Sequence, residues 1–98
     1  MFWGYEGTDL SGLDNWSTSN VINMYRMFRN SSNLENIDNI AGWNVSNVTN
    51  MSGMFYYDSQ IVDLSSLNSW NTSSVSNMTE IFYNVPASVT RPTWYNGT

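Results

Sequence analysis

Three tryptophans, Trp16, Trp43 and Trp70, lie 27 residues apart, and nearly the same block of sequence follows each of them. The blocks WSTSNVINMYRMF, WNVSNVTNMSGMF and WNTSSVSNMTEIF align without a gap. A period of about 20 to 50 residues is typical of repeat proteins, in which each unit buries its apolar face only against its neighbours. We therefore expect the chain to fold as a stack of equivalent units.

Before each tryptophan, apolar residues recur at every third position, as Ile61, Leu64 and Leu67 do before Trp70. This spacing matches neither the alternation of a half-exposed strand nor a sustained helical period. It predicts a tightly turning, short extended arm that contains at most a very short strand.

After each tryptophan the pattern changes. Val48, Met51 and Phe55 follow the i, i+3, i+7 spacing of about two helical turns, and Ser46 is placed to cap the first free N–H groups. The sequence thus predicts an α/β repeat fold, a right-handed solenoid of short coils, each with a short extended arm and one small helix. Trp43, Val48, Met51 and Phe55 should be buried between neighbouring coils.

The chain is expected to begin in the middle of a repeat, because Met1 and Phe2 match Met54 and Phe55 in register. We expect residues 1–82 to form a three-coil array that is part of a longer chain.

The last residues depart from the repeat pattern. The apolar columns end after Phe82, and Pro86 and Pro92 enter the sequence. Proline removes a backbone donor and stops further stacking. Residues 83–98 are therefore expected to form a C-terminal cap.

The composition excludes several classes of function. Three Arg, no Lys and eight acidic residues give a net charge of −5, which argues against a nucleic-acid partner, since phosphate binding needs several cations. The absence of His and Cys removes the commonest general base and metal ligand and all thiolate chemistry. No apolar run approaches the roughly 20 residues of a membrane span, and the start of the sequence lacks a signal-peptide pattern. An export signal or anchor is expected outside these residues.

The block WNVSNVTNMSGMF, preceded by the LxxLxxW spacing and followed near the end of the chain by RPTWY, resembles the BspA-type leucine-rich surface repeat. That repeat has a period of about 26 residues and occurs in surface proteins and lipoproteins of lactic acid bacteria, Listeria and mycoplasmas. The resemblance covers nearly the whole chain. It implies a leucine-rich-repeat-like solenoid, an extracellular location on a bacterial cell surface and a role in attachment or adhesion. It implies no catalytic residue, and we expect no cofactor.

The composition leaves room for one enzyme class, a glycosidase with paired carboxylates. Asp9 and Asp63 share one aligned position, with Asn36 between them, near the upper limit of spacing for an inverting pair. The alternative is an exposed turn in which Asp and Asn side chains bind their own backbone, and we favour it. A carbohydrate-active enzyme is a remote alternative, and we predict that the chain is not an enzyme. The Asp and Asn content could suggest calcium, but no spacing matches an EF-hand or a GGxGxD turn, and calcium binding stays open.

Two aligned sets of residues are predicted to be structural. They are Trp16, Trp43 and Trp70, and Asn23, Asn50 and Asn77. Aromatic columns at a repeating period are more often core than ligand site. The asparagines are expected to form a buried ladder in which each amide binds the backbone of its own and the next coil; an exposed asparagine column and a ligand-contacting one are the alternatives.

Surface tyrosines are the candidates for function. Tyr56 and Tyr57 follow the predicted helix of the second repeat, and Tyr83 occupies the position of Tyr56 one repeat later. Stacked coils should bring the three rings into one strip with a spacing of roughly 5 Å, and such rings offer rigid contact area with a polar tip. We therefore expect a non-catalytic extracellular module that binds a host or cell-surface protein or glycan. If the tyrosines only cover the edge of a thin core, the chain is a structural spacer or display stalk.

Overall fold

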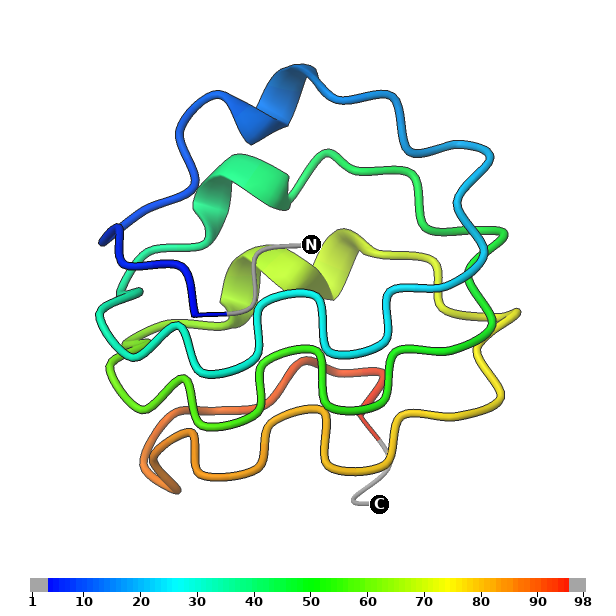
Figure 1. Cartoon of the computed structure of the whole chain (residues 1–98). Helices are drawn as coiled ribbons and strands as arrows, with labels where there is room; N and C mark the ends of the chain where they lie inside the picture. Colours follow the sequence, from blue (N-terminus) through cyan, green and yellow to red (C-terminus); the bar gives the residue numbers. More distant parts are fainter. Residues whose placement is uncertain (1–3, 96–98) are drawn as a thin grey trace.

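The computed structural model describes residues 4–95, and within them successive repeats lie side by side in register. The Met24 N–H donates to the Asn50 carbonyl at 2.9 Å, and the Met51 N–H donates to the Asn77 carbonyl at 2.8 Å. Isolated parallel bridges join Asn23 to Asn50 and Asn50 to Asn77. Figure 1 shows successive passes of the chain following the same winding course beside one another. Residues one repeat apart are therefore spatial neighbours.

Three short 3-10 helices, η1 (Leu13–Asn15), η2 (Asp38–Ile40) and η3 (Ser65–Ser69), each lie shortly before a tryptophan. η2 packs between η1 and η3 (Figure 1). A 3-10 helix has three residues per turn, so side chains three positions apart lie on one side. The last two apolar residues of each series span this turn, since the Leu67 N–H donates to the Leu64 carbonyl at 3.0 Å. Ile61 lies before it in a segment without regular secondary structure, so the spacing of three only partly reflects the 3-10 helix.

The predicted fold class is wrong. An α/β repeat, built as a leucine-rich-repeat-like right-handed solenoid with an extended arm and one small helix per coil, is not what forms. Within residues 4–95 the structure has no α-helix and no strand, and its regular elements are the three 3-10 helices and the two isolated bridges. The molecule is a compact arrangement of turns.

Three overlapping tight turns replace the helix that was predicted after Trp43, and in the middle one the Tyr56 N–H donates to the Gly53 carbonyl at 3.1 Å. The Met54 N–H donates to the Met51 carbonyl at 3.2 Å, and the Asp58 N–H donates to the Phe55 carbonyl at 3.1 Å. The third residue of the first and of the last turn, Gly53 and Tyr57, has a φ of 64°, as a type II turn requires. The equivalent positions in the other two repeats are also left-handed: Arg26, Asn30, Glu80 and Asn84.

The physical reason for these turns lies in the polar residues and in the neighbouring repeat. Asn and Ser side chains compete for the backbone and weaken a helix, and a helix of two turns gains little from cooperativity. Within these turns, the Gly53 N–H donates to the Thr79 carbonyl at 3.0 Å, and the Phe55 N–H donates to the Ile81 carbonyl at 2.9 Å. Neighbouring repeats thus satisfy the backbone groups that a helix would satisfy internally.

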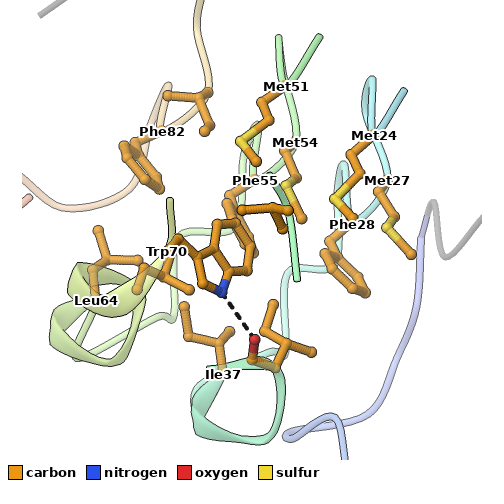
Figure 2. Packing of buried hydrophobic residues seen from close by; sticks show 14 of the residues in the cluster. Met24, Met27, Phe28, Ile37, Met51, Met54, Phe55, Leu64, Trp70 and Phe82 are labelled. Carbon is orange, nitrogen blue, oxygen red and sulfur yellow. Dashed lines mark hydrogen bonds between the residues drawn. The ribbon is translucent and has the colours of Figure 1, made fainter. Parts of the chain in front are cut away.

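The core is a continuous stack of aromatic and aliphatic side chains. The rings of Phe28, Phe55 and Phe82 stack with 5.7 Å between successive centroids, and methionines of the first two repeats lie along this stack (Figure 2). Val48, Met51 and Phe55 are fully buried, as predicted. Each repeat therefore completes its core against its neighbours.

The tryptophans tie each repeat to the one before it. The indole N–H of Trp43 donates to the Leu13 carbonyl at 2.8 Å, and that of Trp70 donates to the Ile40 carbonyl at 3.0 Å (Figure 2). Both side chains are buried, as predicted for Trp43, whereas Trp16 is 46% exposed and stacks on Trp43 with 6.2 Å between ring centroids. The tryptophan column thus combines packing with satisfied polar groups.

Trp94 stacks on Trp70, although it follows Trp70 at a shorter spacing in sequence than one repeat. Its ring lies 6.3 Å from that of Trp70 at an interplanar angle of 6°, and its indole N–H donates to the Leu67 carbonyl at 2.7 Å. The segment around Trp94 therefore packs on the last repeat.

Arg91 holds this C-terminal segment by binding backbone carbonyls. Its Nη1 atom donates to Pro86 and Val89 at 3.0 Å, and its Nη2 atom donates to Val85 at 3.1 Å and to Phe82 at 3.5 Å. The planar guanidinium suits this set of acceptors because it carries five N–H donors in a fixed fork.

We expect Arg91→Ala to lower the free energy of unfolding by about 2 to 3 kcal/mol, because it leaves carbonyls of the C-terminal segment without a charged donor. Arg91→Lys should recover only part of the loss, since an ammonium group has three donors and no fork. Arg26→Ala removes the same charge from a position without such hydrogen bonds and should cost less than about 0.5 kcal/mol. Urea unfolding followed by tryptophan fluorescence measures all three, and equal losses for Arg91→Ala and Arg26→Ala would contradict the role of Arg91.

Candidate functional site

Tyr56, Tyr57 and Tyr83 lie together on the surface and form one aromatic cluster, here named the tyrosine strip. The rings of Tyr56 and Tyr83 stack with centroids 4.9 Å apart, and the Tyr57 ring meets both edge-on at 4.6 and 5.5 Å. Tyr57 is 42% exposed and Tyr83 is 47% exposed, while Tyr56 is half-buried between its neighbours. The structure thus brings the three predicted residues into mutual contact; their binding role stays a prediction.

The backbone beneath the tyrosine strip fixes the direction of the rings. The Tyr57 N–H donates to the Tyr83 carbonyl at 2.8 Å, and the Asn30 N–H donates to the Tyr56 carbonyl at 2.8 Å. Tyr57 has a φ of 64°, a conformation uncommon for a bulky residue. This left-handed turn directs Tyr57 to the side of the column that Tyr56 and Tyr83 share.

Arg29 extends the strip by one repeat, because its guanidinium carbon lies 4.8 Å from the centroid of the Tyr56 ring. Partial burial raises the pKa of the Tyr56 hydroxyl above its usual value, and the neighbouring Tyr57, Glu80 and Tyr83 add to this effect, while Arg29 opposes it. The Tyr56 hydroxyl therefore stays protonated at neutral pH and is available as a hydrogen-bond donor.

A pocket of about 300 Å³ opens beside the strip at Gly53, and we name it the Gly53 notch. Tyr56 lines the notch as well as the strip, so the two features are continuous. The other lining residues are Tyr25, Arg26, Ser52, Asn77, Thr79 and Glu80. Aromatic faces, hydroxyls, an amide and one charge of each sign thus meet in one place.

The asparagine column is more exposed than the expected buried ladder. Asn50 is half-buried, and Asn23 and Asn77 are exposed. Each side-chain oxygen accepts the backbone N–H two residues further on, at 2.8 Å from Tyr25, 2.9 Å from Ser52 and 3.0 Å from Thr79. These are local Asx turns, for which Asn is suited. Contact between repeats runs through the backbone of this column, which carries the parallel bridges.

Asp9 and Asp63, the two residues of the remote glycosidase alternative, also form Asx turns. The Asp9 carboxylate accepts hydrogen bonds from the Ser11 N–H at 3.2 Å and the Ser11 hydroxyl at 3.0 Å, and Asp63 accepts one from the Ser65 N–H at 2.8 Å. This bond lowers the pKa of Asp63, which is unsuitable for a general acid. The geometry matches the exposed-turn interpretation of this column.

Within residues 4–95, no group of three His, Cys, Asp or Glu side chains is arranged to hold a metal ion. The helices in the same part of the chain also fall short of the length and apolar character that crossing a bilayer requires.

The sequence reasoning missed the Gly53 notch. The signal was present in the alignment of the repeats, where Arg26, Gly53 and Glu80 share one position. A glycine between two charged residues of opposite sign leaves space in that column. A pocket at Gly53 can be predicted only once the three residues are known to lie side by side.

Comparison with known proteins gives one family. The family model described as "Mycoplasma protein of unknown function, DUF285" matches residues 1–93. Comparisons with curated proteins and with solved structures found no match. Because the family model covers nearly the whole sequence, the chain belongs to this Mycoplasma family of unknown function.

Proposed function

We propose that the chain is a non-catalytic binding module of a bacterial surface protein, and that the tyrosine strip is its contact face for a host or cell-surface glycan or protein. The observation that carries the proposal is the mutual contact of three rings, two of which are more than 40% exposed.

The rigidity of the strip supports binding. Each ring is braced by the other two, and the backbone below is fixed by hydrogen bonds between repeats. Ordering a mobile side chain at an interface costs about 0.5 to 1.5 kcal/mol, so rings that are already ordered favour association. Tyrosine also combines apolar area with a hydroxyl, which makes it common in binding surfaces.

A location at the cell surface is supported by two observations. The WNVSNVTNMSGMF block resembles the BspA-type surface repeat, and the family is one of Mycoplasma proteins. The composition agrees, since 38 Asn, Ser and Thr residues stand against 11 charged ones, an unusual balance for a cytosolic protein.

Replacing Tyr56, Tyr57 and Tyr83 together with alanine should abolish attachment of the chain to its target cells. The loss of folding free energy should stay below about 1.5 kcal/mol, as expected for surface positions. Binding of the fluorescently labelled chain to cells measures attachment, and thermal melting measures stability.

A matched control replaces Ile22 and Val62, which are 62% and 71% exposed and belong to neither the strip nor the notch, with serine. This variant should attach like the wild type. If the triple alanine variant also attaches normally, the strip is no contact face and the chain is better described as a spacer.

A further inference from the structure

The Gly53 notch exists because one side chain is missing from a column of three. Arg26, Gly53 and Glu80 occupy the same position in successive repeats and share the left-handed conformation, with φ values of 54°, 64° and 58°. The column therefore does not require glycine for its backbone, since two larger residues adopt the same geometry. A Cβ atom at Gly53 would lie 3.1 Å from Cγ of Arg26, so glycine keeps open the space beside the Arg26 stem.

The walls of the notch combine flat aromatic faces with hydrogen-bonding groups. The Arg26 guanidinium lies 4.7 Å from the centroid of the Tyr25 ring, which directs the cation along one wall. Glu80 stands on the opposite side of Gly53 in the column, and Ser52, Asn77 and Thr79 add hydroxyl and amide groups. Among residues 4–95, no Ala, Val, Leu, Ile or Met side chain lines the notch.

We propose that the Gly53 notch is a subsite for one neutral sugar unit of a glycan, whose adjoining unit stacks on the tyrosine strip. A sugar ring has apolar C–H faces and a rim of hydroxyls that both donate and accept, which matches tyrosine faces beside a carboxylate, a guanidinium, an amide and hydroxyls. The pocket volume of about 300 Å³ lies at the small end of ligand sites, which suits a single ring. Tyr56 lines the notch and stacks on Tyr83, so a chain of sugar units has a continuous path.

The opposite charges at the notch favour a neutral ligand over an anionic one. Arg26 and Glu80 supply one positive and one negative charge at the notch, so an anionic ligand attracted by the guanidinium is repelled by the carboxylate. A peptide anchor is usually an apolar or aromatic side chain in a desolvated pocket, and within residues 4–95 these walls contain no Ala, Val, Leu, Ile or Met side chain. The proposal rests on the proposed binding function and narrows it to a neutral glycan.

The test uses NMR titration of the 15N-labelled chain with defined probes. These are lactose, maltotriose and the N-acetylglucosamine trisaccharide as neutral sugars, a hyaluronan tetrasaccharide as the acidic sugar, and a mixture of tripeptides. At least one neutral sugar should shift the amide signals of Gly53, Tyr56 and Thr79.

Two substitutions test whether the notch carries this binding. Gly53→Asn should weaken affinity at least about tenfold by filling the notch, and asparagine tolerates the left-handed backbone. Thr79→Val keeps the side-chain volume and removes a hydroxyl, so it should weaken affinity about threefold to tenfold, as loss of one hydrogen bond does. Thr90→Val, at an exposed position outside the notch, is the matched control and should bind like the wild type.

The outcomes separate this proposal from the proposed function. Binding of a neutral sugar that both notch variants weaken supports the subsite, whether or not the triple tyrosine variant still attaches to cells. Loss of cell attachment in the tyrosine variant, without any neutral sugar bound at the notch, overturns the subsite and leaves the tyrosine contact face standing. Binding of only the acidic sugar or the peptides, or full affinity in Gly53→Asn, also overturns the proposal.

Discussion

Replacing Trp43 with alanine is expected to lower the free energy of unfolding by about 3 to 5 kcal/mol, the range for removing a large aromatic side chain from a core. Trp43 is 5% exposed, stacks between Trp16 and Phe28, and donates its indole N–H to the Leu13 carbonyl. The substitution therefore removes packing on two sides and leaves a carbonyl without its donor. For a domain of this size, such a loss is a large share of the total stability, and urea unfolding followed by circular dichroism measures it.

Trp16 provides the control for this prediction. It occupies the same position in the first repeat but is 46% exposed, so Trp16→Ala should cost less than half as much as Trp43→Ala. Equal losses at the two positions would mean that the stability of the protein does not come from packing between repeats.

The register of the repeats could be predicted from sequence because burial imposes it. Phe28, Phe55 and Phe82 stack in space as they align in sequence, since each repeat offers its apolar residues to the same positions of the next. Local structure could not be predicted in the same way. The i, i+3, i+7 spacing of Val48, Met51 and Phe55 fits a helix, but it fits a series of tight turns equally well, because turns of three to four residues also return side chains to one face.

The choice between helix and turns depends on long-range contacts. The left-handed conformations at Gly53 and Tyr57 are favourable only when the N–H groups of every second residue donate to carbonyls of the next repeat. The spacing of apolar residues gives no information on these carbonyl acceptors, which lie 26 residues away along the chain.

The candidate site was predictable in part for the same reason. The alignment of Tyr56 with Tyr83, and a spacing of roughly 5 Å between stacked units, led to the strip that the structure contains at 4.9 Å. The Gly53 notch was not predicted, since it arises from an absent side chain. The asparagine column was misjudged because an Asx turn and a buried ladder need the same residue type.

Asp58 is a buried acidic residue that the periodicity did not single out. It shares its position with Ser31 and Val85, both buried. One carboxylate oxygen accepts the Ser31 N–H at 2.7 Å, while the other, Oδ2, has no hydrogen-bond partner among residues 4–95. Burial raises the pKa of this carboxyl from 3.8 to about 8, and the Ser31 N–H opposes the shift. The folded protein therefore holds Asp58 in its neutral form at pH 7.

The stability of the protein should consequently fall as the pH rises from 4 to 8. Over that range the folded state keeps a proton on Asp58 that the unfolded chain has released, so the folded state binds more protons and loses stability with increasing pH. The contribution is fully present below the unfolded pKa of 3.8 and is lost as the pH passes through the folded value of about 8. At 1.36 kcal/mol per pKa unit, the total change is on the order of 5 kcal/mol.

Urea unfolding from pH 4 to pH 9 measures this dependence in the wild type and in two variants. Asp58→Asn keeps the acceptor for the Ser31 N–H and removes the titration, so its stability should stay nearly constant between pH 5 and pH 8 and exceed that of the wild type at pH 9. Asp63→Asn is a control of opposite sign, because the Ser65 hydrogen bond lowers the pKa of Asp63 in the folded state. The stabilisation that ionised Asp63 contributes is present above its unfolded pKa and is lost only as the pH falls below that value. Asp63→Asn should therefore keep the wild-type slope between pH 5 and pH 8. A wild-type curve that is flat over this range would mean that Asp58 is ionised in the folded state, and that the core around it admits water.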